Sequence, residues 1–129
     1  MISYGFTKEL DRPFEQVVET VTEALKKEGF GILTTIDVKE KLKEKLGVEF
    51  KKYLILGACS PKHAHQALLA EENIGLMLPC NVVVYEKDSK TVVSVIKPTT
   101  MMSMLNNEKL AKIAEAVEGL LKKVFDAIT

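Results

Sequence analysis

Residues 53–61, with the sequence YLILGACSP, place a strand directly before the start of a helix. Tyr53 to Leu56 is apolar on both faces, which predicts a strand over residues 50–59 that ends at Cys59. Ser60 and Pro61 are typical of the N-cap and first turn of a helix, which we expect to continue to about residue 72. The thiol of Cys59 is therefore expected to lie one residue before a helix N-cap.

Strands and helices alternate in the sequence before this stretch. Residues 2–8 alternate apolar and polar side chains, as in a short strand. Apolar residues then recur at helical spacing from Phe14 to Leu25, and Gly29 provides a stop. Residues 30–36 are rich in side chains that favour strands. Asp37, with Glu40 three residues later, predicts the start of a second helix, which Gly47 ends.

A hairpin and a final helix are predicted after residue 80. Residues 81–85 and 91–96 flank the polar turn 86–90, so these two strands should pair antiparallel. Apolar residues recur at helical spacing from Leu110 to Ile128, after Asn106 and Asn107. The resulting order, β-α-β-α-β-α-β-β-α, favours an α/β (α+β type) fold in a single domain over residues 1–129. We expect a two-layer sandwich with helices on a mixed five-stranded sheet.

The overall charge and composition restrict the classes of partner. The 129 residues contain 18 Lys+Arg and 18 Asp+Glu, so the formal net charge is zero. This balance does not favour nucleic acid or an anionic membrane surface as a partner. The first residues lack the apolar stretch of a secretory signal, and no apolar run is long enough to span a membrane. We therefore expect a cytoplasmic protein in which the two cysteines are free thiols.

Two of the predicted strands have no polar face. They contain YLIL at residues 53–56 and VVVY at residues 82–85. A two-layer sandwich covers only one face of its sheet, so the second face needs a further layer. Either helices lie on both faces or another subunit covers the second one. We favour a homo-oligomer, in the simplest case a dimer.

Three strand ends are expected to meet at the edge of the sheet where Cys59 lies. If the third and fourth strands are antiparallel neighbours, Cys80 begins the fourth strand at that edge, and the fifth strand ends there at Lys97. A helix N-terminus beside two thiols and a cation favours a small ligand or anion, and its dipole would lower a thiol pKa. The candidate ligand-binding residues are Cys59, Ser60, Pro61, Cys80, Asn81 and Lys97.

Two other interpretations of the same residues stay open. Cysteine often packs as a small buried apolar residue, so both thiols can be purely structural. Alternatively, Cys59 and Cys80 form a redox-active pair or, together with His63, bind a soft metal. Two cysteines and one histidine at irregular spacing are no zinc signature, and His63 and His65 point about 200° apart on a helix. No cofactor can be named from these residues.

The segment between the last strand and the last helix contains Met101, Met102 and Met104. Clustered thioethers can bind Cu(I), but methionines also fill irregular gaps in a core or at an oligomer boundary, which we favour. The sequence has no Gly-rich phosphate loop and no G-x-S-x-G or H-E-x-x-H motif. A small-ligand-binding module is thus expected more than an enzyme, with a ligand-free homo-oligomeric interaction protein as the alternative.

Two blocks of the sequence carry a resemblance to a known family. They are GACSP at residues 57–61 and IGLMLPCNVVVYE at residues 74–86. On these blocks the chain resembles the domain-of-unknown-function family number 302, and the similarity spans nearly the whole chain. The resemblance implies a small α/β protein, dimeric in some members, with no established activity or catalytic residue. Ser60 stands where Asn is common in the family, and either residue can cap a helix.

Overall fold

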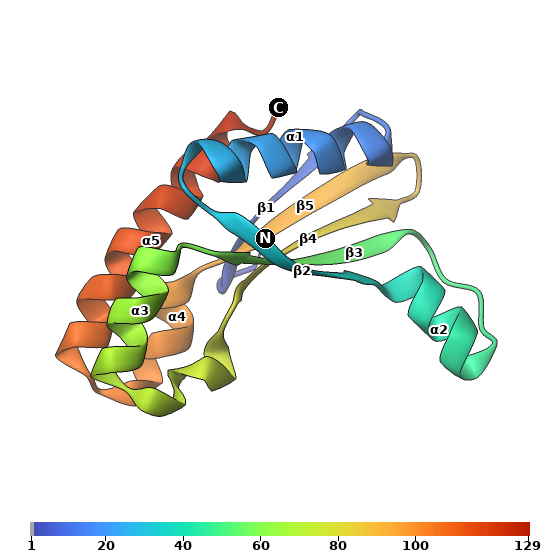
Figure 1. Cartoon of the computed structure of the whole chain (residues 1–129). Coiled ribbons are helices and arrows are strands. Elements are labelled where there is room, and N and C mark those ends of the chain that lie inside the picture. Colours follow the sequence, from blue (N-terminus) through green and yellow to red (C-terminus); the bar gives the residue numbers. More distant parts are fainter. Residues whose placement is uncertain (1) are drawn as a thin grey trace.

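The computed structural model describes residues 2–129, and the order of its elements is the predicted one (Figure 1). The strands are β1 (Gly5–Leu10), β2 (Gly31–Asp37), β3 (Tyr53–Cys59), β4 (Cys80–Lys87) and β5 (Lys90–Ile96). The α-helices are α1 (Phe14–Lys27), α2 (Val38–Leu46), α3 (Pro61–Ala70), α4 (Pro98–Met102) and α5 (Glu108–Ala127). Two 3-10 helices, η1 (Glu72–Met77) and η2 (Ser103–Leu105), precede β4 and α5.

The helices begin and end where the sequence supplies the appropriate backbone chemistry. The Asp37 side chain accepts a hydrogen bond of 3.0 Å from the backbone N–H of Glu40, which starts α2. Gly47 ends this helix at φ +67°, and Gly29 follows α1 at φ +84°, conformations that glycine adopts without a Cβ penalty. The third helix ends at Ala70, earlier than expected, and the chain tightens into η1.

The sheet has the strand order β1-β5-β4-β3-β2, and every neighbouring pair is antiparallel. This corrects the mixed sheet expected from the sequence. The reason lies in the two connections around β3, because α2 and α3 lie beyond the ends of the strands (Figure 1). A strand that turns back beyond the end of its neighbour pairs antiparallel, whereas a parallel pair needs a crossover over the sheet face.

One face of the sheet packs against α1 and α5 and forms the main hydrophobic core. The helices contribute side chains at intervals of three or four residues, as their 3.6-residue period requires. The buried members of this core include Val17, Val21 and Leu25 of α1, Leu121 and Val124 of α5, and Leu56, Val82, Val84, Val93 and Val95 of the sheet. Alternate residues of each strand therefore face the helical layer.

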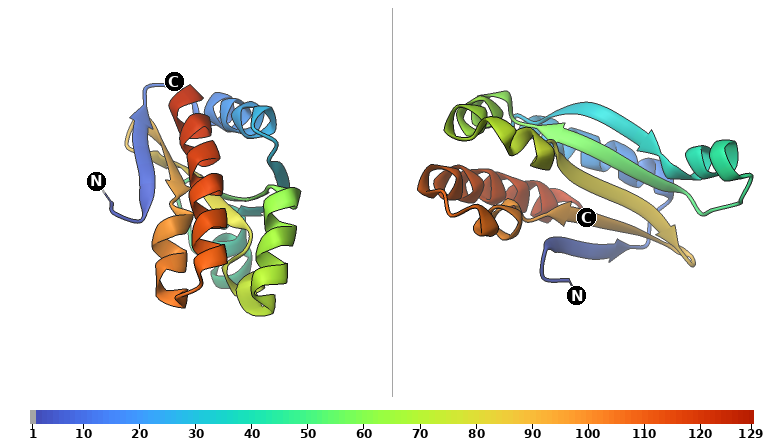
Figure 2. Two further views of the ribbon diagram at one scale, coloured as in Figure 1. Left: turned by 90° about the vertical axis from the view of Figure 1, so that its left-hand side faces the viewer. Right: turned by 90° about the horizontal axis from the view of Figure 1, so that it is seen from below.

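A second, smaller core lies beyond the end of the sheet. There α5 runs between α3 and α4 (Figure 2). Its buried members are Ala67, Ile74, Met102, Leu110 and Ala114. This extension places the start of β4 between the sheet and a group of helices, which is where the predicted site residues lie.

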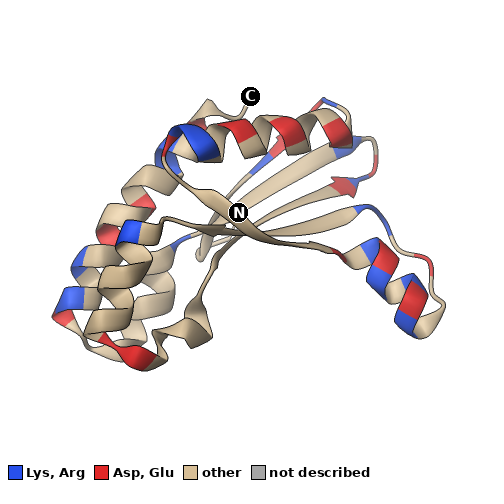
Figure 3. Cartoon of the chain, viewed as in Figure 1, with Lys and Arg blue, Asp and Glu red and all other residues tan. Residues whose placement is uncertain are grey.

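The opposite face of the sheet has no helix packed on it within residues 2–129 (Figure 1). The strand register places Ile55, Val83, Ser94 and Thr7 in one row across this face. Charged residues gather on the helices and at the strand ends, and the middle of the sheet is free of them (Figure 3). None of the helices in residues 2–129 combines the length and apolar character that crossing a bilayer requires.

Candidate functional site

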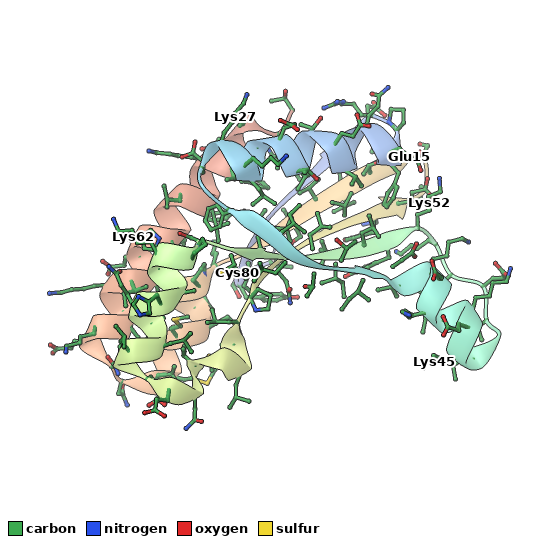
Figure 4. All side chains as sticks on the ribbon, viewed as in Figure 1. Glu15, Lys27, Lys45, Lys52, Lys62 and Cys80 are labelled. Carbon is green, nitrogen blue, oxygen red and sulfur yellow. The ribbon has the colours of Figure 1, made fainter. Side chains whose placement is uncertain are left out.

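The antiparallel register of β3 and β4 brings the two cysteines to one edge of the sheet. Ala58 pairs with Cys80, so Cys59 and Cys80 lie at neighbouring positions of adjacent strands. Both are free thiols. Figure 4 shows Cys80 at the point where β4 enters the sheet from the group of helices. Two residues that lie 21 positions apart in the chain are thus neighbours at the predicted edge.

A small apolar cavity lies beside the two thiols. Its wall includes Cys59, Ser60 and His63 from the β3–α3 junction and Pro79 and Cys80 from the start of β4. Side chains of α4 and α5 close the remaining sides. The cavity volume is about 30 Å³, which is room for one or two water molecules. Side chains therefore fill most of the expected binding region.

Ser60 and His63 form a hydrogen-bonded pair at the start of α3. The distance between Ser60 Oγ and His63 Nδ1 is 2.7 Å. Ser60 occupies the predicted N-cap position, but its side chain accepts no backbone hydrogen bond because it is directed to the imidazole. His65, two residues further on, is exposed and does not line the cavity. Helical geometry thus separates the two histidines, as expected.

Burial raises the pKa of both thiols. Loss of solvent is the cause for Cys59. For Cys80 it acts together with the charge of Cys59 and raises the pKa from 9.0 to about 11. The expected lowering by the helix N-terminus is therefore wrong, because desolvation outweighs the helix dipole at this position. Both side chains are thiols at neutral pH and weak nucleophiles.

Three of the predicted site residues lie away from the cavity. Pro61 is exposed in the first turn of α3. Asn81 has its side chain on the open face of the sheet, in the row of Gly57. The Nζ atom of Lys97 is 4.9 Å from the ring centroid of Phe6, so the cation contacts β1. Among the described residues, the cavity wall contains no Lys or Arg side chain that would pair with an anion.

The expected weak metal ligands do not form a metal site. Cys59, Cys80 and His63 all line the cavity. Within residues 2–129, however, no three His, Cys, Asp or Glu side chains lie together in a way that could hold a metal ion.

A second hollow on the other side of Cys80 was not predicted. Met77, Met101, Met102 and Cys80 all line it, and its volume is about 190 Å³. Met77 precedes β4, whereas the other two methionines follow β5. The sequence signalled a group of methionines at residues 101–104, but nothing local indicates that Met77 lies beside them.

Gly57 is a further constrained residue at this edge. A Cβ atom at this position would lie 2.2 Å from Thr34 Oγ1 and 2.6 Å from Pro79 Cγ. The peptide bond before Pro79 is cis. The close approach of β2, β3 and the start of β4 therefore explains why residue 57 lacks a side chain.

Comparisons with known proteins agree with this architecture. The family model described as "Domain of unknown function DUF302" matches residues 6–128. A crystal structure of an uncharacterized conserved DUF302 protein from Bacillus stearothermophilus is 33% identical, with a TM-score of 0.91 over 99% of this chain and 100% of that one. No curated protein matches this chain. Because the match extends over nearly all of the sequence and the fold, the chain belongs to the DUF302 family.

Proposed function

We propose that the protein is a homodimeric interaction module whose two subunits join through the open face of the sheet. The observation that carries this proposal is that face itself, on which Ile55, Val83 and the paired tyrosines Tyr53 and Tyr85 lie together and which no helix of residues 2–129 covers. Soluble monomers rarely expose a continuous apolar surface of this kind. A binding role is supported more than an enzymatic one, because partial burial raises the pKa of both thiols at the cavity and keeps them protonated at neutral pH.

The centre of the open face is suited to burial. Ile55 and Val83 lie side by side in the central row. Tyr53 and Tyr85 stack with their ring centroids 5.1 Å apart in the next row, toward the charged margin. The main polar groups in the central row, on Thr7 and Ser94, bond each other at 2.8 Å. They can be covered without losing a hydrogen bond, so burial carries little desolvation cost.

A second copy of the chain fits this face better than a charged partner. In a twofold contact the same patch faces itself, so charges in its centre would repel one another. Here the charges stay at the margin, where Lys87 lies 3.9 Å from Glu9 and Lys51 lies 4.8 Å from the Tyr85 ring centroid. An apolar centre with a polar rim is the usual arrangement of a stable interface.

The size of the face is sufficient for a small stable interface. Five strands spaced about 4.8 Å apart, each with about six residues of about 3.3 Å, give a surface of about 24 by 20 Å. Once the relief of the side chains is included, two such faces reach about 1,200 Å², the lower end of stable interfaces.

Sedimentation velocity at micromolar concentration tests the proposal. The unmodified protein should be a dimer, and Val83→Lys should be a monomer because it places two cations opposite each other at the centre. Ala116→Lys adds the same charge on the exposed side of α5 and should leave the dimer intact. Thr7→Lys on the edge strand β1 serves as a second interface variant if Val83→Lys does not fold.

Two results would contradict the dimer. One is a monomeric unmodified protein at these concentrations. The other is a folded Val83→Lys or Thr7→Lys variant, verified by circular dichroism, that dimerises with unchanged affinity.

The cavity beside Cys59 favours a second candidate function, the binding of an uncharged solute no larger than one or two water molecules. Its wall is apolar apart from the thiols and the Ser60–His63 pair. Native mass spectrometry of protein purified without added ligand should then show a bound mass that Ala64→Leu, which fills the cavity from α3, removes. An unmodified protein with no bound mass would exclude this candidate, and the same spectrum reports the subunit count independently.

A further inference from the structure

Most of the sulfur atoms of this chain gather at one place. The sequence contains two cysteines and five methionines. One hollow is lined by Met77, Met101, Met102 and Cys80. Cys59 lies in the adjoining cavity, whose wall also includes Cys80 and Met102. Five of the seven sulfur-containing side chains thus surround the start of β4.

These side chains come from three elements that only the tertiary structure brings together. Met77 ends η1, Cys80 begins β4, and Met101 and Met102 lie in α4. The complete β4–β5 hairpin separates Met77 from Met101 in the sequence. The arrangement is therefore a property of the fold and not of a local methionine-rich sequence.

The rest of the hollow offers no hard ligand. Its remaining wall is formed by Leu76, Leu78, Pro79, Asn81, Ile96 and Pro98. None of these carries a carboxylate, imidazole or ammonium group, so the site gives little to Mg²⁺, Ca²⁺ or an anion. Thiolate and thioether sulfur select soft metals, and a site with two thioethers and one thiolate suits Cu(I).

The solvent exposure of Met77 and Met101 distinguishes them from methionines that only fill a core. Met102 is 8% exposed and belongs to the second core, so its presence is explained by packing alone. Met77 and Met101 are only half-buried, and each has part of its side chain on the hollow. The neighbouring Leu76 is 89% exposed, so solvent reaches this side of the molecule. A metal ion can therefore reach the hollow from solvent without a rearrangement of the hydrophobic core.

We propose that this hollow is a Cu(I) site in which the thioether sulfurs of Met77 and Met101 and the sulfur of Cys80 are the ligands. Copper enters and stays as Cu(I), so no electron is transferred. When Cys80 binds as a thiolate, its proton passes to solvent, and binding strengthens as the pH rises. All three ligands come from one chain, so the site does not need a second subunit, although Asn81 of its wall also borders the open face.

Competition for Cu(I) under anaerobic conditions tests the site. The unmodified protein should take one Cu(I) per chain from bicinchoninate, and native mass spectrometry should show one Ag(I) per chain. Met77→Leu and Met101→Leu conserve volume in an apolar wall. Each should weaken Cu(I) binding about tenfold or more, since one of three soft ligands is lost. Met104→Leu is the matched control, because Met104 is 65% exposed and does not line the hollow.

The results that would contradict the Cu(I) site differ from those that would contradict the proposed dimer. A protein that takes no Cu(I) from the competitor, or a Met77→Leu/Met101→Leu double variant with unchanged affinity, would exclude the methionine ligands. Binding that Cys80→Ala abolishes while the double methionine variant retains it would point to a thiol pair alone and would also overturn the proposal. Repeating the titration on Thr7→Lys shows whether Cu(I) binding survives when the subunits separate, as expected.

Discussion

At Gly57 the chain passes between Thr34 and Pro79 without space for a side chain. An added Cβ would lie 2.2 Å from Thr34 Oγ1 and 2.6 Å from Pro79 Cγ. Gly57→Ala should therefore lower the free energy of unfolding by about 1–3 kcal/mol through overpacking. Urea denaturation gives this value directly. A variant as stable as the unmodified protein would show that β2 and Pro79 can move apart at no cost.

Gly119 in α5 provides the matched control for the same substitution. No atom lies within 4 Å of a Cβ placed there, and the residue is in a helix interior. Gly119→Ala should stabilise the protein by about 0.5–1 kcal/mol because it reduces the freedom of the unfolded chain. If Gly57→Ala lowers the free energy of unfolding and Gly119→Ala raises it, the loss at position 57 is due to steric contact there and not to the replacement of a glycine as such.

The thiol of Cys80 predicts a loss of stability in alkaline solution. Its pKa is raised from 9.0 to about 11, chiefly by burial and then by the charge of Cys59. Below pH 9 the thiol is protonated in both states, whereas between pH 9 and 11 it ionises only in the unfolded chain. The free energy of unfolding should therefore fall across this interval, by about 3 kcal/mol at most.

Urea denaturation across this pH range measures the effect, with Cys80→Ala as the reference. The variant lacks the titrating group, so its stability should fall less steeply with pH than that of the unmodified protein. Equal slopes would show that Cys80 is as well solvated in the folded protein as in the unfolded chain.

Among the elements, α5 is capped at its N-terminus by the side chain of Asn107. The Asn107 side chain accepts a hydrogen bond of 3.1 Å from the backbone N–H of Leu110. Asn107→Ala should cost about 1 kcal/mol of stability, because the freed N–H has no other acceptor at the helix end. Thermal unfolding measures the loss. Asn107→Asp keeps the acceptor oxygen and should remain close to the unmodified protein, and equal losses in both variants would contradict the capping role.

At the scale of the whole molecule, Lys8 ties the first strand to the end of the last helix. Its Nζ atom donates to the backbone oxygens of Phe125 and Ile128 at 2.7 and 2.6 Å and lies 4.2 Å from the Phe125 ring centroid. Lys8→Met should lower the free energy of unfolding by about 1–2 kcal/mol, since charged hydrogen bonds at a helix C-terminus are lost.

Lys122 provides the control for Lys8. It forms an exposed ion pair with Asp126 one turn along α5, and such pairs contribute little. Lys122→Met should therefore change stability by less than about 0.5 kcal/mol. Urea denaturation compares the two variants. Similar decreases in the free energy of unfolding would mean that the hydrogen bonds from Lys8 to the end of α5 contribute no more than an exposed ion pair.

Local patterns were sufficient to predict the elements and most of their ends. Asp37, Gly47 and Asn107 act where the sequence indicated, because capping depends on atoms within four residues of one another. The hairpin of β4 and β5 followed from the polar turn between two apolar strands. The predicted meeting of Cys59 and Cys80 is also correct, since it required only that β3 and β4 be antiparallel neighbours.

The chemistry of the site was decided by the tertiary structure. The helix N-terminus beside Cys59 predicted a lowered thiol pKa, but burial by distant side chains reverses the sign. Lys97 reaches the expected edge of the sheet, yet its cation turns to Phe6 on β1. Met77 meets Cys80 and Met101 only because η1 and α4 pack at the same end of β4.

The sequence by itself therefore determined the order of the elements, the ends of α2 and α5 and the family, since period and capping depend on neighbours along the chain. Only the tertiary structure decided the all-antiparallel strand order, the solvation of the thiols and the gathering of the sulfur atoms. All three features depend on contacts between residues that are far apart in the sequence, because such contacts decide which side chains lose solvent. A local sequence pattern does not contain this information.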